Sequence, residues 1–287
     1  MVLDSTARRL STDPQIKVFC ILSDERAFRL KSPAMFSAVI KRTGMKGVYV
    51  PFMVQPNNIG AAMQSLRVLN IAGANITVPY KEVVVPHLDI LSEGANIIGS
   101  VNTIVRDGEK LKGYNTNAIG FMDALDHIGF EVAGKSALVF GSGGIAKAVV
   151  FIFNWLRAES IIVAGRNDEK TKQVADRIGG EVRSLESLTE SPLNVDIIVN
   201  ATSVSSTEES PELSKVVEKL QAPKCKLVLD FNYGRLQNFW EDMAKAKGIP
   251  FMDGLQPLAF QARRTFALWT KIQVDPSEFL KAIEGKD

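Results

Sequence analysis

Residues that build metal centres and disulfide frameworks are scarce in this chain of 287 residues. It has two cysteines, Cys20 and Cys225, and two histidines, His87 and His127. Neither histidine has metal-type spacing to the other or to a pair of cysteines, so we expect no metal site. The cysteines lie far apart in the sequence, and we expect both to be reduced thiols in a cytoplasmic protein.

Long apolar runs and an excess of charge of one sign are also missing. No segment approaches the roughly 20 apolar residues needed to cross a bilayer, and the polar segment 1–16 lacks the apolar core of a signal peptide. The net charge is +2, from 34 basic and 32 acidic residues interleaved along the chain. No basic stripe stands out, so the sequence predicts a soluble protein that binds neither membranes nor nucleic acids.

The residues that are present suit an α/β protein with one large or two medium domains. Strands alternate with helices in both halves, which predicts largely parallel sheets with covered faces. The expected strands of the first half lie at 16–22, 48–54 and 72–78, its helices at 34–43, 58–69 and 80–88, and a hairpin at 104–112. The expected strands of the second half lie at 136–140, 161–164, 195–199, 227–230 and 250–252, and its helices at 120–127 and about 257–270.

A glycine-rich loop, Gly141-Ser-Gly-Gly144, follows an apolar strand and opens an apolar helix. Glycines let backbone amides approach a pyrophosphate, and the N-terminus of a helix favours its negative charge. A tight structural turn is the alternative, but the βα rhythm continues afterwards, as a dinucleotide-binding fingerprint requires. The residues expected to hold the dinucleotide here are Gly141, Ser142, Gly143, Gly144, Ile145 and Ala146.

The tip of the next expected strand favours NADP over NAD as the cofactor. An NAD site places a carboxylate there for the ribose 2′-hydroxyl, whereas this chain has Gly165 and Arg166, with Lys170 one turn further on. A guanidinium can bind a 2′-phosphate with two parallel hydrogen bonds. The alternatives are that Arg166 is a surface residue and that Asp168 contacts a ribose.

Lys81 lies just past an expected strand tip in the first half, in the segment Asn75-Ile-Thr-Val-Pro-Tyr-Lys81, where Pro79 ends the strand. Chemistry in α/β proteins gathers at such tips. A lysine that acts as an acid or base usually has a carboxylate neighbour. The candidate position, in Gly113-Tyr-Asn-Thr-Asn117, carries an amide instead. The alternative is that both are ordinary surface positions.

These segments occur in the order found in the shikimate dehydrogenase family, which the chain resembles from about residue 16 to 272. Segment 75–82 is similar to the family's N-V-T-x-P-x-K block, and 113–121 to its G-x-N-T-D-x-x-G-F block. Further matches are 98–104 (G-A-V-N-T), 141–144 (nucleotide loop), 200–203 (N-A-T-[PS]), 253–254 (D-G) and 261–270 (Q-A-x5-W). The resemblance implies a substrate domain over 1–115, onto which a C-terminal helix of about 257–287 packs, and a Rossmann-type NADP domain over 116–256.

The activity implied is the reversible NADP-dependent oxidation of shikimate to 3-dehydroshikimate, or of a related acid such as quinate, by a monomer or homodimer. Lys81 would be the catalytic lysine, and Asn117 takes the place of the family's catalytic aspartate. The implied substrate contacts are Ser32 for the carboxylate, Asn75, Thr77 and Asn102 for the ring hydroxyls, and Tyr233 and Gln261. The implied cofactor contacts outside the glycine-rich loop are Arg166, Lys170, Thr202 and Gly254.

Three departures from the family leave the identity of the acid open. Leu30 replaces the first serine of the S-x-S-P motif, and Arg29 beside it is a candidate for a replacement charge. The stretch 22–26 replaces the glycine-proline-isoleucine that usually precedes this motif, and Ser205-Ser206 replaces a glycine-methionine pair on the nicotinamide side. A divergent relative acting on quinate or a similar acid is consistent with these changes.

Asn117 is the largest departure, because an amide can bond a hydroxyl but cannot exchange a proton. Loss of the carboxylate should lower the pKa of Lys81 and can cost roughly 10²–10⁴ in rate. A divergent enzyme, a low-activity relative and a deliberate substitution all fit, and the intact remainder of the block favours the last. Two other functions stay open: an NADP-binding regulator without turnover, and a folate or amino-acid dehydrogenase of similar build.

Overall fold

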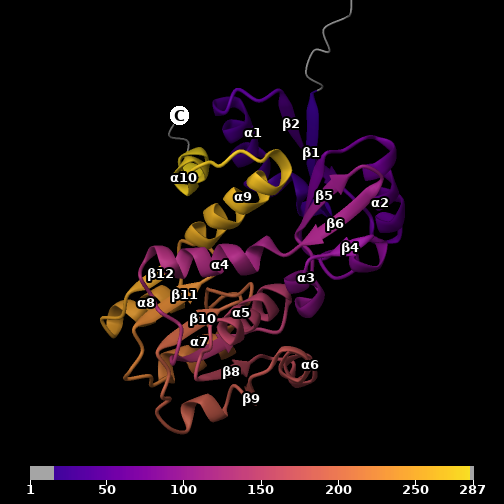
Figure 1. Ribbon diagram of the computed structural model, residues 1–287. Coiled ribbons are helices and arrows are strands. Elements are labelled where there is room, and N and C mark those ends of the chain that lie inside the picture. The colour runs from indigo at the N-terminus through magenta and orange to yellow at the C-terminus, as the bar shows by residue number, and fades with distance from the viewer. Residues whose placement is uncertain (1–15, 285–287) are drawn as a thin grey trace, which may run out of the picture.

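Two six-stranded sheets, one from each half of the chain, organise the computed structural model, which describes residues 16–284 (Figure 1). The expected polar segment 1–16 therefore lies outside the described residues, except for its last residue. In Figure 1 the two halves lie one above the other, and the yellow C-terminal helices return to the first half. Among the described residues, no helix is long and apolar enough to cross a membrane.

The first sheet has the strand order β2-β1-β3-β5-β6-β4 and is mixed, not largely parallel as predicted. Its strands are β1 (Lys17–Ser23), β2 (Gly47–Met53), β3 (Gly73–Ile76), β4 (Ile90–Leu91), β5 (Thr103–Asp107) and β6 (Lys110–Tyr114). β1 pairs in parallel with β2 and β3, and β5 runs antiparallel to β3 and β6. The cause is the β5–β6 hairpin, a predicted feature whose tight turn reverses the chain at Gly108 with φ 60°.

The helix predicted over 80–88 is wrong, because that segment forms turns and a single 3₁₀ turn, η3 (Val85–His87). Pro86 lies inside the predicted helix and has no N–H for its hydrogen-bond ladder. The segment is held by its aromatic side chain instead, since the buried Tyr80 hydroxyl donates to the Val54 carbonyl. The remaining helices of the first half are α1 (Ser32–Arg42), α2 (Ile59–Val68), α3 (Glu93–Ile98), η1 (Glu25–Arg29) and η2 (Pro56–Asn58).

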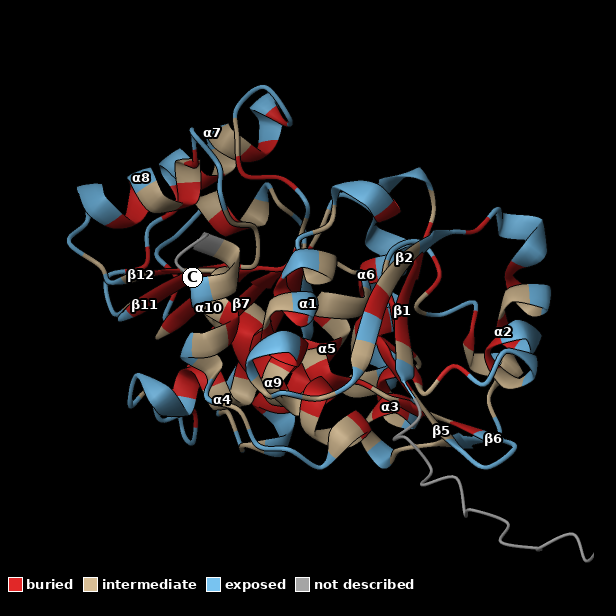
Figure 2. Cartoon of the chain, turned by 90° about the horizontal axis from the view of Figure 1, so that it is seen from above, coloured by how far each residue is buried: buried red, intermediate tan, exposed pale blue. Residues whose placement is uncertain are grey.

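The second sheet is entirely parallel, with the order β12-β11-β10-β7-β8-β9. Its strands are β7 (Ser136–Phe140), β8 (Ser160–Ala164), β9 (Glu181–Arg183), β10 (Ile197–Asn200), β11 (Leu227–Asp230) and β12 (Phe251–Asp253). The order reverses between β7 and β10, which is the switch point of a doubly wound nucleotide fold. β7, β10 and β11 are buried throughout (Figure 2). This confirms the predicted Rossmann-type half.

Helices cover both faces of this second sheet. The helices of the second half are α4 (Thr116–His127), α5 (Gly144–Trp155), α6 (Asp168–Ile178), α7 (Pro211–Lys219), α8 (Phe239–Ala246), α9 (Leu255–Thr270), α10 (Pro276–Glu284) and the 3₁₀ turn η4 (Ser187–Thr189), of which α10 packs on the first half instead. α4 begins at Thr116 and not at Gly120, because the Asn115 side chain caps it by accepting from the Ala118 amide at 3.2 Å. Asn117 therefore lies in the first turn of a helix and not on a strand tip.

The C-terminal helices pack against the first sheet. Trp269 of α9 stacks on Phe19 of β1 with ring centroids 4.9 Å apart, and its indole N–H donates to the Ile104 carbonyl of β5 at 2.9 Å. α10 follows and packs its Phe279 against Phe36 of α1. The last two helices thereby join the first sheet to the second half of the chain, and α9 brings its own side chains to the space between them.

We expect Gly73→Ala to lower the free energy of unfolding by about 1–3 kcal/mol, because it overpacks the contact between β3 and Trp269 of α9. A Cβ at Gly73 would lie 2.2 Å from the Trp269 indole nitrogen. Thermal and urea unfolding measure the effect. Gly94→Ala is the matched control, since its Cβ would meet Phe151 at an ordinary 3.5 Å. Equal stability of the two variants would show that Trp269 is not held against β3.

Candidate active site

One cavity of about 190 Å³ collects all eight residues that the sequence indicates for catalysis and substrate binding. They come from both halves of the chain, and they are Ser32, Asn75, Thr77, Lys81, Asn102, Asn117, Tyr233 and Gln261. Ser32 begins α1, and the segment after β3 carries Lys81. Gln261 reaches the cavity from α9, and Tyr233 follows β11. Residues up to 229 positions apart in sequence (Ser32 to Gln261) thus line the same cavity.

Asn102 is the centre of a hydrogen-bonded amide network in this cavity. Its Oδ1 accepts from the Thr116 backbone N–H at 2.7 Å, which fixes the orientation of the amide. Its Nδ2 therefore faces the other way, toward Asn117 Oδ1 at 3.1 Å and Gln261 Oε1 at 3.0 Å. Because these groups are buried or half-buried, their positions are set before any ligand binds.

The orientation of Asn117 follows from that of Asn102. Since Asn102 presents a donor, Asn117 must present Oδ1 to it, and Asn117 Nδ2 points elsewhere. That nitrogen is buried and has no hydrogen-bond partner among the described residues. A buried donor without an acceptor costs about 1–3 kcal/mol. The site therefore holds a fixed N–H donor ready for a ligand oxygen, at the position where an aspartate would offer an oxygen.

Lys81 is half-buried, and the surrounding protein lowers its pKa from 10.5 to about 8 by desolvating the ammonium. No carboxylate lies within ion-pair distance of its Nζ in the described part of the chain. The downward shift of the Lys81 pKa has the direction expected from the loss of an acidic neighbour, but its cause here is burial. A lysine with a pKa near 8 can accept and return a proton close to neutral pH.

Tyr49 is a site residue that the sequence analysis missed. Its buried hydroxyl donates to Asn75 Oδ1 at 2.8 Å, and Asn75 Nδ2 donates in turn to the Asn102 carbonyl at 3.1 Å. Tyr49 thus orients the amide of Asn75 toward the cavity. The signal in the sequence was weak, because a tyrosine in an apolar strand is usually part of the core.

A second cavity, of about 490 Å³, lies at the tips of β7, β8 and β10. Its lining includes Gly141, Ser142, Gly143, Arg166 and Thr202 of the predicted cofactor residues. The other five do not line it: Ile145 and Gly254 line the first cavity, Gly144 starts α5, Ala146 is buried, and Lys170 is exposed on α6.

The glycine-rich loop has the geometry that a dinucleotide needs. Gly141 has φ 122°, and a Cβ there would lie 3.0 Å from the Ala201 carbonyl oxygen, so only glycine fits. Gly143, the N-cap of α5, borders open space, and no described atom lies within 4 Å of a Cβ built on it. Pyrophosphate oxygens can therefore approach the amides that begin α5. The residues present fit a bound dinucleotide.

The structure also shows where the residues that depart from the family's S-x-S-P motif lie. Leu30 lines the first cavity, and Arg29 is exposed and does not. The structure thus gives no support to Arg29 as the replacement charge. Lys31, between them and Ser32 in the sequence, has its Nζ 5.6 Å from the centroid of the Tyr233 ring. The Lys31 ammonium therefore lies over the ring of Tyr233, which lines the cavity.

Comparison with known proteins agrees with this geometry. Residues 29–104 match the model of the shikimate dehydrogenase substrate binding domain, and residues 124–238 match that of shikimate / quinate 5-dehydrogenase. An NADP(+) shikimate dehydrogenase of Caldanaerobacter subterraneus subsp. tengcongensis is 35% identical over 96% of this chain and 100% of its own length. The chain belongs to the shikimate dehydrogenase family. The predicted family is thereby confirmed.

Solved structures of this family share the whole fold. That of the Thermus thermophilus shikimate 5-dehydrogenase, in complex with NADP(H) and shikimate, has a TM-score of 0.83 and 30% identity, covering 95% of this chain and 100% of that one. The shikimate dehydrogenase of Aquifex aeolicus also has a TM-score of 0.83 at 30% identity, covering 94% and 98%. The family members combine an N-terminal substrate domain with a Rossmann-type NADP-binding domain, as predicted for this chain.

Proposed function

We propose that this protein catalyses the reversible NADP-dependent oxidation of a secondary alcohol of shikimate or of a closely related cyclohexane or cyclohexene carboxylate such as quinate. The observation that carries the proposal is the convergence of Lys81, Asn117 and the Asn102 amide network in one cavity. That cavity adjoins the nucleotide loop: a Cβ built on Gly144 would lie 3.9 Å from Cδ of Lys81. When bound, NADP would supply the acceptor for the hydride of the alcohol carbon.

We further propose which residues hold the substrate and the cofactor. Asn75, Thr77 and Asn102 bind ring hydroxyls, Ser32 binds the carboxylate, and Tyr233 and Gln261 contact the substrate. Arg166 and Lys170 bind the 2′-phosphate, although Lys170 does so from an exposed position one turn along α6. We place the division between substrate domain and NADP domain at residues 115/116, with the helices from about 257 returning to the first. The domain limits 1 and 287 fall outside the described residues.

Lys81 moves the hydroxyl proton in this proposal. In the direction of oxidation its neutral amine accepts the proton, and in the direction of reduction its ammonium returns it. Asn117 donates its free N–H to the same reacting oxygen or to a neighbouring one. An N–H donor stabilises negative charge that develops on that oxygen, but it cannot share the proton with the lysine. Lys81 therefore works without the second proton-carrying group.

The pH dependence should report Lys81 directly. Its pKa of about 8 means that the neutral base is formed as the pH rises through that value. We expect kcat/KM for oxidation to rise up to about pH 8 and then to level off, and the reverse reaction to fall over the same range. Initial rates across pH in both directions measure this. An inflection near pH 10 would contradict the proposal that desolvation lowers the pKa of Lys81.

A second candidate function, NADP and ligand binding without turnover, is favoured by one observation, the absence of an acidic side chain among the described residues that line the substrate cavity. Steady-state assays with shikimate and quinate, each with NADP and NAD, separate the two. Tight binding of both ligands with near-zero turnover would support the second candidate.

For the cell we propose a cytoplasmic monomer or homodimer whose two cysteines, both free in the structure, stay reduced.

A further inference from the structure

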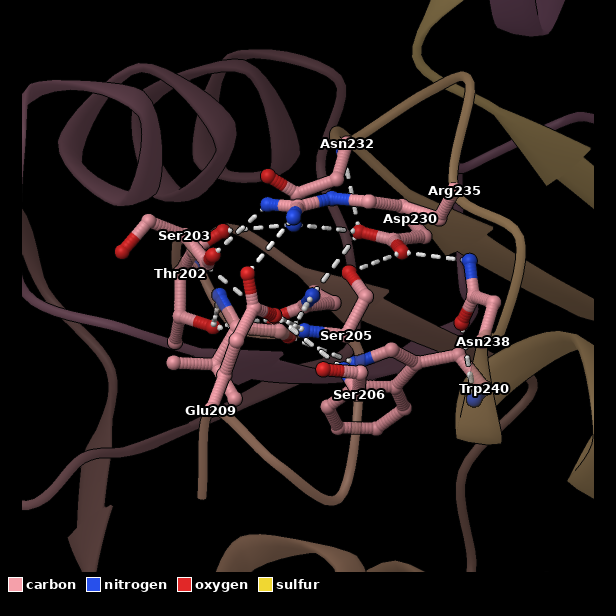
Figure 3. Close-up of polar contacts among 12 residues, drawn as sticks. Thr202, Ser203, Ser205, Ser206, Glu209, Asp230, Asn232, Arg235, Asn238 and Trp240 are labelled. Atoms are coloured by element: carbon pink, nitrogen blue, oxygen red, sulfur yellow. Dashed lines mark hydrogen bonds and ion pairs between the residues drawn. The ribbon is translucent and has the colours of Figure 1, made fainter.

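The loop that follows β10 forms one wall of the cofactor cavity. Ala201, Thr202, Ser203 and Val204 line that cavity, and Ser205-Ser206 come directly after them, where the family's usual pair is glycine-methionine. This inference rests on the proposed function in that the cavity is taken as the NADP site. The side chain of Ser205 and the backbone amides of both serines form hydrogen bonds with two carboxylates (Figure 3).

The side chain of Ser205 is fully buried and donates to a buried carboxylate. Its Oγ lies 2.6 Å from Oδ2 of Asp230, the last residue of β11. Asp230 also accepts from the side-chain amides of Asn200 and Asn238 at 2.8 Å and from the backbone of Asn232 at 2.9 Å. Burial raises the pKa of Asp230, and these donors oppose the shift. No cation pairs with it in the described part of the chain, so the donors alone stabilise its charge.

The backbone of the same two serines is held by a second carboxylate. Glu209 Oε2 accepts from the amides of Ser205 at 2.8 Å and Ser206 at 3.1 Å. Its Oε1 forms an ion pair with Arg235 at 2.6 Å, and Arg235 donates to the Ser203 carbonyl at 3.1 Å. Burial raises the pKa of Glu209, but the backbone donors and Arg235 outweigh it, so the net shift is downward.

These contacts join the two cavities. Asn232 donates from its side chain to the Thr202 carbonyl at 2.9 Å, and its neighbours Phe231 and Tyr233 line the substrate cavity. The loop after β10 and the loop after β11 are therefore one hydrogen-bonded unit, with the cofactor cavity on one side and the substrate cavity on the other. Figure 3 shows Asp230 bonded to Ser205 and Asn238, and Arg235 bonded to Glu209 and Ser203.

We propose that Ser205 and Glu209 are positioning residues that hold the wall 201–204 in its cofactor-binding shape before the cofactor arrives. A loop that is ordered in advance loses less conformational freedom on binding, and this raises affinity without a new contact to the ligand. Neither residue lines the substrate cavity, so the effect belongs to cofactor binding and not to the chemical step. The serine hydroxyl supplies a bond to Asp230 that a glycine at this position cannot make.

The test compares two variants with their sequence neighbours as matched controls. Ser205→Ala removes the bond to Asp230, and Ser206→Ala removes a hydroxyl that has no side-chain bond to another described residue. Glu209→Ala removes the acceptor of both amides, and Glu208→Ala removes an exposed neighbour that pairs with nothing among residues 16–284. We expect Kd for NADP, titrated calorimetrically without substrate, to rise about 5- to 20-fold in the first member of each pair and less than about twofold in the second. In steady-state assays, KM for NADP should rise along with Kd, and kcat should stay within about twofold of the wild-type value.

Hydrogen exchange of the amides 203–206 adds a readout that does not need a bound cofactor. It should become faster in Glu209→Ala than in Glu208→Ala, while circular dichroism shows that all four variants are folded. Equal NADP affinity in the wild type, Ser205→Ala and Glu209→Ala would overturn this inference alone. A wild-type protein that does not bind NADP would overturn the proposed cofactor and this inference together.

Discussion

Replacement of Lys81 by methionine is expected to lower kcat for shikimate oxidation by about 10²–10⁴-fold, the range for loss of a general base. Methionine keeps an apolar stem and removes the amine. Among the described residues, the lining of the cavity holds only one other titratable side chain, Tyr233, and burial raises the pKa of its hydroxyl. The tyrosine therefore cannot take the proton near neutral pH. KM for shikimate should change less than about fivefold, because the amides that bind the ring remain.

Initial-rate kinetics with shikimate and NADP measure this effect, and Lys112→Met provides the control. Lys112 is on β6, where it pairs with Asp107 at the surface, so its loss should leave kcat unchanged. The separate changes in kcat and KM distinguish a base, whose loss lowers kcat, from a binding residue, whose loss raises KM. A Lys81→Met protein that keeps more than about a tenth of the wild-type kcat would show that the proton leaves by another route.

Asn117→Asp is expected to raise kcat at least tenfold at the pH optimum of each protein. The Asn102 donor holds one oxygen of residue 117 in place, so an aspartate would turn its second oxygen to where Nδ2 is now. That oxygen can accept the substrate proton and share it with Lys81. The new charge should also raise the pKa of Lys81, since a nearby carboxylate favours the ammonium.

The pH profile of the variant tests the second part of this expectation. The inflection in kcat/KM for oxidation should move above the value of about 8 that burial alone produces. Asp123→Asn, on the same helix, is a useful counterpart because its carboxylate pairs with Arg264 away from the cavity. Unchanged kcat and an unchanged inflection in Asn117→Asp would show that the amide of Asn117 does not limit the rate.

The sequence sufficed for the fold where the pattern is strong. The buried strands β7, β10 and β11 are uninterrupted apolar runs, and they lie where predicted, within two residues. The edge strand β9 was missed because its residues Glu181 and Val182 are exposed and carry no apolar run. The helix predicted over 80–88 does not form, because Pro86 has no N–H for the hydrogen-bond ladder of a helix.

The residues of the candidate site could be named from the sequence, and eight of them line one cavity in the structure, but their orientations could not be predicted. The resemblance to the family implies that Asn102 and Asn117 belong to one site, yet only the contact from the Thr116 amide shows which way each side chain points. Tyr49 and the start of α4 depend on hydrogen bonds between segments, which no local pattern records. The same holds for Arg29, whose charge looked available in the sequence and is exposed outside the cavity lining in the fold.

The central claim is that Lys81 acts as the base in the oxidation of shikimate or quinate without an acidic partner. Its most direct test compares the initial rate of NADPH formation by the wild-type protein with that of Lys81→Met, with either acid as substrate. We expect slow but saturable turnover of at least one acid by the wild type, with NADP preferred over NAD, and loss of nearly all of it in the variant. Binding of acid and NADP with no turnover by the wild type, or equal turnover by the two proteins, would contradict it.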